Sequence, residues 1–133
     1  MAWLSKPGSH FLRDALLGSF LVLSPAVPAS AQVALSGEKL FAGQCAACHS
    51  LVAGETRIGP SLYKIAGRKA GNYPGFTYSP ALKAARFKWT AANLDSWLTD
   101  TSHFIPGSVM NYRQADAGKR AAIVAWLLDP KTK

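Results

Sequence analysis

The sequence predicts a small all-α domain with long loops, and three observations support this. Residues that can begin a helix recur along the chain at Ser36, Ser79, Thr90 and Asp116. Alternation of apolar and polar residues never runs long enough to indicate a strand, and the connecting stretches are rich in glycine and proline. The chain has 133 residues, of which 49% are hydrophobic, so we expect one compact domain rather than a disordered chain.

Residues 1–31 have the order of a secretory signal. A basic start precedes an apolar run over residues 15–23, and two prolines then lead to the small residues Ala29 and Ala31. We therefore expect cleavage after Ala31, export to the periplasm, and a mature domain of residues 32–133. The alternative is an uncleaved membrane anchor, but the apolar run is short, contains a glycine and is followed by prolines.

The first helix of the domain is predicted to run from Ser36 to about Ala47. The Ser36 side chain can accept a hydrogen bond from a backbone N–H of the first turn. Leu35 and Leu40 have the spacing of a hydrophobic staple across this end. The helix leads the chain directly into its two cysteines.

Three more helices are predicted from capping residues and apolar faces. The first begins at Ser79-Pro80 and ends near Ala85. The second begins at Thr90 and ends near Asp100, and its apolar face consists of Leu94, Trp97 and Leu98. The third begins at Asp116 and ends near Asp129, before Pro130, and its apolar face consists of Ile123, Trp126 and Leu127. Loops as long as those between the helices need something to pack on, and a domain of this size often has a covalent or metallic centre.

The segment Cys45-Ala46-Ala47-Cys48-His49 is a CxxCH motif in a chain with an export signal. At helical spacing Cys45 and Cys48 lie on one face, so both thiols can reach vinyl groups of one porphyrin. His49 then offers its imidazole to the iron from the same side. This pattern predicts one covalently attached haem c per chain, with thioether tethers and a histidine ligand.

Three other interpretations of the cysteines fit less well. A thioredoxin-like redox pair normally follows a strand in a βαβ unit, which this sequence lacks. A zinc site needs four ligands, whereas residues 32–133 contain two cysteines and two histidines, of which His103 is far from the motif. A structural disulfide would leave His49 without a role.

Together with this motif, residues 35–129 resemble a class I c-type cytochrome of the mitochondrial and small bacterial periplasmic kind. The matching features are Gly37 and Phe41 facing Ile123 and Trp126, Gly59-Pro60, Gly67-Arg68, the run Pro74–Ser79, Trp89, and the run Ile105–Met110. The resemblance implies a single-haem fold of three main helices, with short helices and long loops wrapped around the haem.

The resemblance also implies a role for each matched site residue. The Pro60 carbonyl orients His49, Met110 is the second axial ligand, and a haem propionate is supported by Arg68, Tyr78 and Trp89. These roles are physically reasonable, because a buried propionate needs charge-assisted and neutral donors. A thioether ligand raises the reduction potential, which suits an electron carrier.

Each of these residues also has a simpler interpretation. Met110 could fill a gap in the core, but it is the only methionine after residue 31 and lies beside a turn rather than on a helix face. His103 is the other candidate for the sixth position, and we expect it on the surface. Arg68 could be a solvated charge, and Tyr78 and Trp89 could be ordinary core aromatics.

The sequence departs from the family pattern in two places. Where mitochondrial members carry docking lysines near the Pro-Gly turn and the methionine, this chain has Thr101, Ser102, His103 and Val109. Docking partners therefore cannot be copied from the mitochondrial case. Trp97 stands where the family usually has a tyrosine near the axial sulfur, which should shift the reduction potential.

The predicted function is that of a periplasmic one-electron carrier between respiratory or dehydrogenase partners rather than an enzyme. Residues 32–133 retain 13 basic and 6 acidic residues, so a positive surface can steer encounter with acidic redox proteins. Export and the absence of a basic run make nucleic acid a poor partner, and a membrane surface is reached only through partners. The alternative is a haem-containing electron-transfer subunit of an oxidoreductase, or a small peroxidase-like oxidoreductase. The donor, the acceptor and the oligomeric state are not indicated.

Overall fold

The computed structural model describes residues 36–132. The predicted signal over residues 1–31, its cleavage after Ala31, and Leu35 of the predicted staple lie outside this range. Within it, no helix is both long and apolar enough to span a bilayer.

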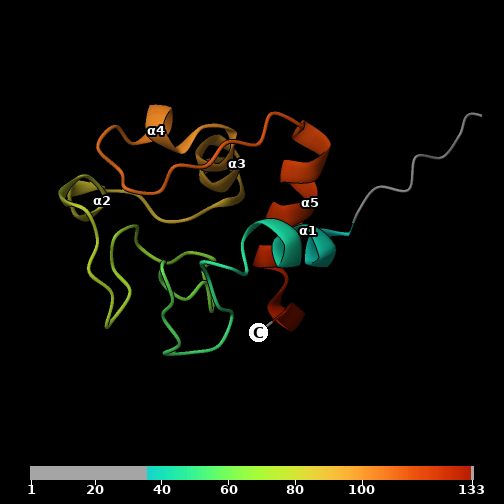
Figure 1. The fold of residues 1–133 in the computed structure, drawn as a ribbon, viewed down its shortest axis with the longest axis horizontal. Helices are drawn as coiled ribbons and strands as arrows, with labels where there is room; N and C mark the ends of the chain where they lie inside the picture. Colours follow the sequence, from blue (N-terminus) through green and yellow to red (C-terminus); the bar gives the residue numbers. More distant parts are fainter. Residues whose placement is uncertain (1–35, 133) are drawn as a thin grey trace, which may run out of the picture. The chain divides into compact units, whose positions relative to one another are not determined.

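The described residues form five α-helices and a short 3₁₀ helix, joined by long loops (Figure 1). They are α1 (Gly37–Gln44), α2 (Pro80–Ala84), α3 (Ala91–Thr99), α4 (Thr101–Phe104), α5 (Ala117–Leu128) and η1 (Pro130–Thr132). Between residues 36 and 132 there is no strand, and one isolated bridge pairs Lys69 with Lys88. The predicted all-α class is confirmed.

The four predicted capping residues all begin helices as expected. Each side chain accepts a hydrogen bond from the backbone N–H three residues later: Ser36 from Lys39 (3.3 Å), Ser79 from Leu82 (3.3 Å), Thr90 from Asn93 (3.2 Å) and Asp116 from Lys119 (3.0 Å).

Helix α1 is shorter than predicted, because it ends at Gln44 rather than near position 47. The backbone N–H groups of Cys45 and Ala46 both donate to the Phe41 carbonyl, at 2.8 and 3.0 Å, so the regular register stops there. The Cys48 N–H then donates to the Cys45 carbonyl at 3.0 Å. The two cysteines therefore lie in hydrogen-bonded turns that follow the helix.

Helix α4 was not predicted from the sequence. Asp100 is extended (φ −165°) and separates α3 from α4, and its carboxylate accepts a hydrogen bond from the His103 N–H at 2.9 Å. The predicted third helix therefore ends one residue early, and a four-residue helix begins directly after it. At the other end of the domain, Pro130 begins η1 instead of ending all helical structure.

Helices α1 and α5 pack against each other, as the resemblance implied (Figure 1). A Cβ on Gly37 would overlap the Ala122 carbonyl and the Trp126 side chain, so only glycine allows this close approach. The rings of Phe41 and Trp126 lie 4.9 Å apart, and Ile123 of α5 is fully buried. This contact fixes the start of the cysteine segment against the C-terminal helix.

Helix α3 also packs on α5 and buries Leu94, Trp97 and Leu98, as predicted. Asp95 and Arg120 join the two helices through an ion pair of 2.9 Å. The Arg120 side chain is 12% exposed and also donates to two backbone carbonyls before α5.

Candidate functional site

A cavity of about 390 Å³ lies among the long loops, α3 and α5. Its volume is in the range of cavities that hold cofactors. All eight residues predicted to contact the haem line it: Cys45, Cys48, His49, Pro60, Arg68, Tyr78, Trp89 and Met110. The remaining lining is mostly apolar and includes Leu62, Ile65, Leu82, Leu94, Leu98, Ile123 and Leu127.

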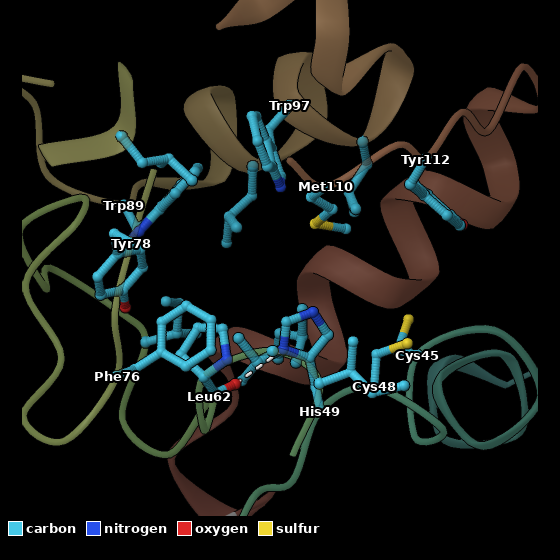
Figure 2. A pocket seen from close by; sticks show the side chains of 18 of the residues that line it. Cys45, Cys48, His49, Leu62, Phe76, Tyr78, Trp89, Trp97, Met110 and Tyr112 are labelled. Carbon is cyan, nitrogen blue, oxygen red and sulfur yellow. Dashed lines mark hydrogen bonds between the residues drawn. The ribbon is translucent and has the colours of Figure 1, made fainter. Parts of the chain in front are cut away.

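The ligand candidates lie on opposing walls of this cavity (Figure 2). His49 is on one wall, and Met110 is on the wall across from it, beside Trp97. The two cysteines lie at one end, whereas Tyr78 and Trp89 lie at the other. The site thus has two thiols at one end and the hydrogen-bond donors of two aromatic side chains at the other. Between these ends, an imidazole nitrogen and a thioether sulfur face each other across the cavity.

The His49 ring is held in one orientation. Its Nδ1 lies 2.8 Å from the Pro60 carbonyl oxygen, which can only accept, so Nδ1 carries the proton and Nε2 keeps its lone pair. Burial lowers the pKa of His49, although the Pro60 bond acts in the opposite direction. A Cβ on Gly59 would overlap the imidazole ring. The structure therefore presents a neutral imidazole with Nε2 available to a metal.

The loop that carries Pro60 is tied to the cysteine segment. The Gly59 N–H donates to the Cys48 carbonyl at 2.8 Å, and the Arg57 side chain donates to the Ala46 carbonyl. The Gly59 carbonyl in turn accepts from the Arg57 N–H at 2.9 Å. These bonds fix the position of the Pro60 carbonyl relative to the histidine that it orients.

Cys45 and Cys48 are free thiols in the structure. Burial, with a smaller contribution from Cys48, raises the pKa of the Cys45 thiol to about 11. A reactive redox cysteine has a lowered pKa and a stable thiolate near neutral pH. The environment of Cys45 is therefore unlike that of a thioredoxin-like redox pair.

The Arg68 side chain lines the cavity together with Tyr78 and is held in place by its own contacts. Its guanidinium donates to the carbonyls of Ser61 and Tyr63, both at 3.0 Å, and lies 4.6 Å from the ring centre of Tyr73. Burial lowers the pKa of Arg68 and raises the pKa of Tyr78, so the tyrosine keeps its hydroxyl proton near neutral pH. This end of the cavity offers a cationic fork and a neutral donor, which suits a carboxylate.

Trp89 is both a core aromatic and a cavity residue. It is 8% exposed, and its ring packs edge-on against Phe87 (5.0 Å) and Trp97 (5.7 Å). Its backbone pairs with the Arg68 segment, because its N–H donates to the Arg68 carbonyl and its carbonyl accepts from Gly67, each at 2.8 Å. Trp89 therefore both packs in the aromatic core and lines the cavity, so the structure agrees with both interpretations of this residue.

Met110 reaches the cavity from the turn after α4. Gly107 in this turn has φ +84°, a backbone conformation that residues other than glycine rarely adopt. The Met110 N–H donates to the Ser108 hydroxyl at 3.2 Å. His103, the competing candidate, is exposed on α4 and does not line the cavity. Its predicted place on the surface agrees with the structure.

Sequence reasoning missed several residues that shape this site. Ser61 and Tyr63 contribute backbone carbonyls, which every residue type offers, so no sequence signal could identify them. Tyr73 lies between Arg68 and the 54–60 loop, where its hydroxyl accepts from the Gly54 N–H at 2.7 Å. The hydroxyl of the buried Thr101 donates to the Met110 carbonyl and accepts from the Tyr112 N–H.

The residues present fit an iron porphyrin tethered by two thioethers. The cavity has apolar walls for the macrocycle, a nitrogen and a sulfur donor on opposing sides, and two thiols near the histidine. The half-buried guanidinium of Arg68 provides a partner for carboxylate groups.

Comparisons with known proteins agree with this geometry. The sequence profile of the family "Cytochrome c" matches residues 34–130. The chain is 37% identical over 94 residues to cytochrome c2 of Rhodopila globiformis, a match that covers 70% of this chain and 89% of that protein. It is 34% identical over 118 residues to cytochrome c2 of Blastochloris viridis, covering 87% and 92% of the two chains.

Among solved structures, cytochrome cH from Methylobacterium extorquens superposes with a TM-score of 0.65 at 38% identity. The match covers 75% of this chain and 98% of that one. This protein therefore belongs to the cytochrome c family, whose members bind a covalently attached haem c and carry electrons rather than act as enzymes.

Proposed function

We propose that this chain is an exported one-electron carrier in which His49 and Met110 are the two axial ligands of the haem iron. The observation that carries the proposal is the placement of the two side chains on opposing walls of one cavity. His49 has its Nε2 lone pair available because Pro60 holds the Nδ1 proton. With both axial positions taken by protein side chains, no position is left for a substrate, which suits electron transfer.

The covalent tethers in this proposal are Cys45 and Cys48. Both sulfurs line the cavity next to His49, on a segment that is hydrogen-bonded to α1. When bound, the haem supplies a one-electron iron couple. The thioethers keep it in place in either oxidation state, and the apolar walls exclude water from it.

Arg68, Tyr78 and Trp89 are proposed to bind a propionate of the same haem. Arg68 is held by two carbonyls, so part of its fork remains for an anion without a large loss of side-chain freedom. Tyr78 is a half-buried protonated phenol, and the Trp89 indole is a donor only. The three groups together offset the cost of burying a carboxylate.

The electron is proposed to leave and enter where the cavity meets the surface. Ile58 and Val109 line the cavity and are 80% and 79% exposed, so the cavity reaches solvent between them. This rim is apolar. The positive charge of residues 32–133 is proposed to steer acidic redox partners toward it, and apolar contact then forms the short-lived complex.

Spectra of the purified protein test the axial ligands. The wild-type ferric protein should be low-spin, with the weak red band that sulfur ligation produces, and a pyridine haemochrome assay should report one haem c. Met110→Ala should become high-spin and lose this band, whereas Met110→His should stay low-spin without it. A low-spin Met110→Ala spectrum identical to wild type would contradict the assignment.

Removal of the tethers tests the covalent attachment. The double variant Cys45→Ser with Cys48→Ser should carry no covalent haem and, because the haem fills the centre of the domain, should lose most of its helical circular dichroism. A haem-free double variant with native helicity would show that the cofactor is not part of the core.

Export is tested by fractionation of a Gram-negative host and N-terminal sequencing. We expect the holoprotein in the periplasmic fraction with Gln32 as its first residue, after cleavage at Ala31. Retention of Met1, or recovery in the membrane fraction, would instead support the anchored alternative.

A further inference from the structure

Thr101 contributes a polar side chain that the predicted roles do not use. It is 0% exposed, and its hydroxyl lies between two backbone groups that flank the methionine segment. Its Oγ1 donates to the Met110 carbonyl at 2.7 Å and accepts from the Tyr112 N–H at 2.9 Å. We call this pair of bonds the Thr101 clamp.

The Thr101 clamp satisfies two partly buried backbone groups with one hydroxyl. A hydroxyl has a single proton, and the shorter contact assigns it to the Met110 carbonyl rather than to the Tyr112 carbonyl at 3.1 Å. The Tyr112 carbonyl instead accepts from the Thr101 backbone N–H, also at 3.1 Å. Loss of the hydroxyl would leave the Met110 carbonyl and the Tyr112 N–H without this partner in a partly buried place.

The clamp closes the base of the loop that carries Met110. Thr101 begins α4, the chain turns at Gly107, and it returns to lie against Thr101 at positions 110 and 112. Away from this base, much of the loop is exposed, and Val109 next to the methionine is 79% exposed. A loop with few buried contacts opens readily, so the bonds at its base dominate its stability.

We propose that Thr101 is a positioning residue that holds Met110 at the sixth coordination position and sets how often that position opens to other ligands. The proposal rests on the axial role proposed for Met110. The clamp favours the closed loop, and an external ligand binds the iron only when the loop opens and the methionine sulfur leaves.

Substitution can separate the hydroxyl from the shape of the side chain. Thr101→Val keeps the branched shape and removes the hydroxyl, whereas Thr101→Ser keeps the hydroxyl and removes a methyl group. Thr99→Val is a matched control, because the Thr99 hydroxyl donates to the Asp95 carbonyl within α3 at 2.8 Å and does not contact the methionine loop.

The test measures the binding of imidazole to the ferric holoprotein, followed by loss of the sulfur band. Thr101→Val should bind imidazole about tenfold to a hundredfold more tightly, the range that follows from leaving a partly buried hydrogen-bonding group unpaired. Thr101→Ser and Thr99→Val should stay within about threefold of wild type. Equal affinities for Thr101→Val and wild type, or equal effects of valine and serine, would overturn the proposal.

A measurement on the unmodified chain keeps the proposal testable if Thr101→Val does not fold. Coupling between two sites is reciprocal, so displacement of Met110 by saturating imidazole must weaken the clamp. Hydrogen exchange at the Tyr112 amide should therefore accelerate by about tenfold or more, while the amide of Ile123 in α5 stays unchanged. An unaltered exchange rate at Tyr112 would contradict the role assigned to Thr101.

Failure of the Met110 assignment would look different. In that case wild type would lack the sulfur band, and Met110→Ala would bind imidazole as wild type does, whatever the Thr101 variants show. If the band is present and Met110→Ala binds imidazole more tightly, then only the clamp is at issue in the Thr101 comparison.

Discussion

Gly37→Ala should weaken the contact between α1 and α5. The new Cβ would overlap the Ala122 carbonyl and the Cβ of Trp126, neither of which lies at the end of a flexible side chain. The backbone of one helix must therefore move. Gly43→Ala in the same helix is the matched control, because no heavy atom lies within 4 Å of its new Cβ.

The two substitutions should have opposite signs. Overpacking of a well-packed interface costs about 1–3 kcal/mol, and the gain in helix propensity from glycine to alanine offsets at most ~1 kcal/mol of it. We expect Gly37→Ala to lower the free energy of unfolding by about 2 kcal/mol. Gly43→Ala has only the propensity gain and should raise it by about 0.5–1 kcal/mol.

Thermal unfolding of the holoproteins, followed by circular dichroism, measures both effects. A domain of about 100 residues shifts its Tm by roughly 4–8 °C per kcal/mol. The Tm should therefore fall by roughly 8–16 °C for Gly37→Ala and rise by roughly 2–8 °C for Gly43→Ala. A Gly37→Ala protein as stable as Gly43→Ala would refute the packing argument.

Three further variants test other parts of the structure. Gly59→Ala should push the His49 ring from its position, so the variant should show less low-spin haem and a lower yield of holoprotein; a wild-type spectrum would contradict this. Arg68→Met removes a half-buried positive charge that favours the reduced haem, an effect of about 1–2 kcal/mol. The reduction potential should therefore fall by roughly 40–85 mV. An unchanged potential in a redox titration would contradict the proposed propionate contact. Arg120→Met should lower the free energy of unfolding in urea by about 1–3 kcal/mol, because the Asp95 pair and two carbonyl bonds are lost; an unchanged urea midpoint would mean that these bonds add nothing.

The main helices could be predicted because their signals are local. Ser36, Ser79, Thr90 and Asp116 each cap the helix that follows through a bond to a residue three positions away, and such spacing is visible in the sequence. Helix α4 has the same kind of cap, because the Asp100 carboxylate accepts from the His103 N–H, but no apolar face of several turns follows this cap in the sequence. A four-residue helix has too few internal hydrogen bonds to form alone, and it is stabilised by the pairing of Thr101 with the distant Tyr112.

The end of α1 depends on a similar effect. Residues 45–47 have the composition of a helix, but the cysteine segment is also bound by the loop before Pro60, through the Gly59 N–H and the Arg57 side chain. These contacts join residues that are about ten positions apart, and no periodicity in the sequence reports them. The tertiary contacts therefore override the local preference.

The site was predictable where a residue type carries the chemistry. The spacing of Cys45, Cys48 and His49 indicates a haem from sequence alone, and the family pattern supplied Arg68 and Met110 as candidates. The bonds that hold these side chains are of another kind, because Arg68 and Met110 are both positioned through backbone carbonyls. Such bonds depend on the fold and leave no mark on residue identity.

The pairing of α1 with α5 has a kinetic consequence. The two helices are joined by roughly seventy residues, and closing a loop of that length costs about 4 kcal/mol of chain entropy. The cap of α3, in contrast, joins Thr90 to Asn93, which are only three positions apart. This one long-range contact therefore raises the average sequence separation of the native contacts, and the domain should fold more slowly than an all-helical bundle of the same length.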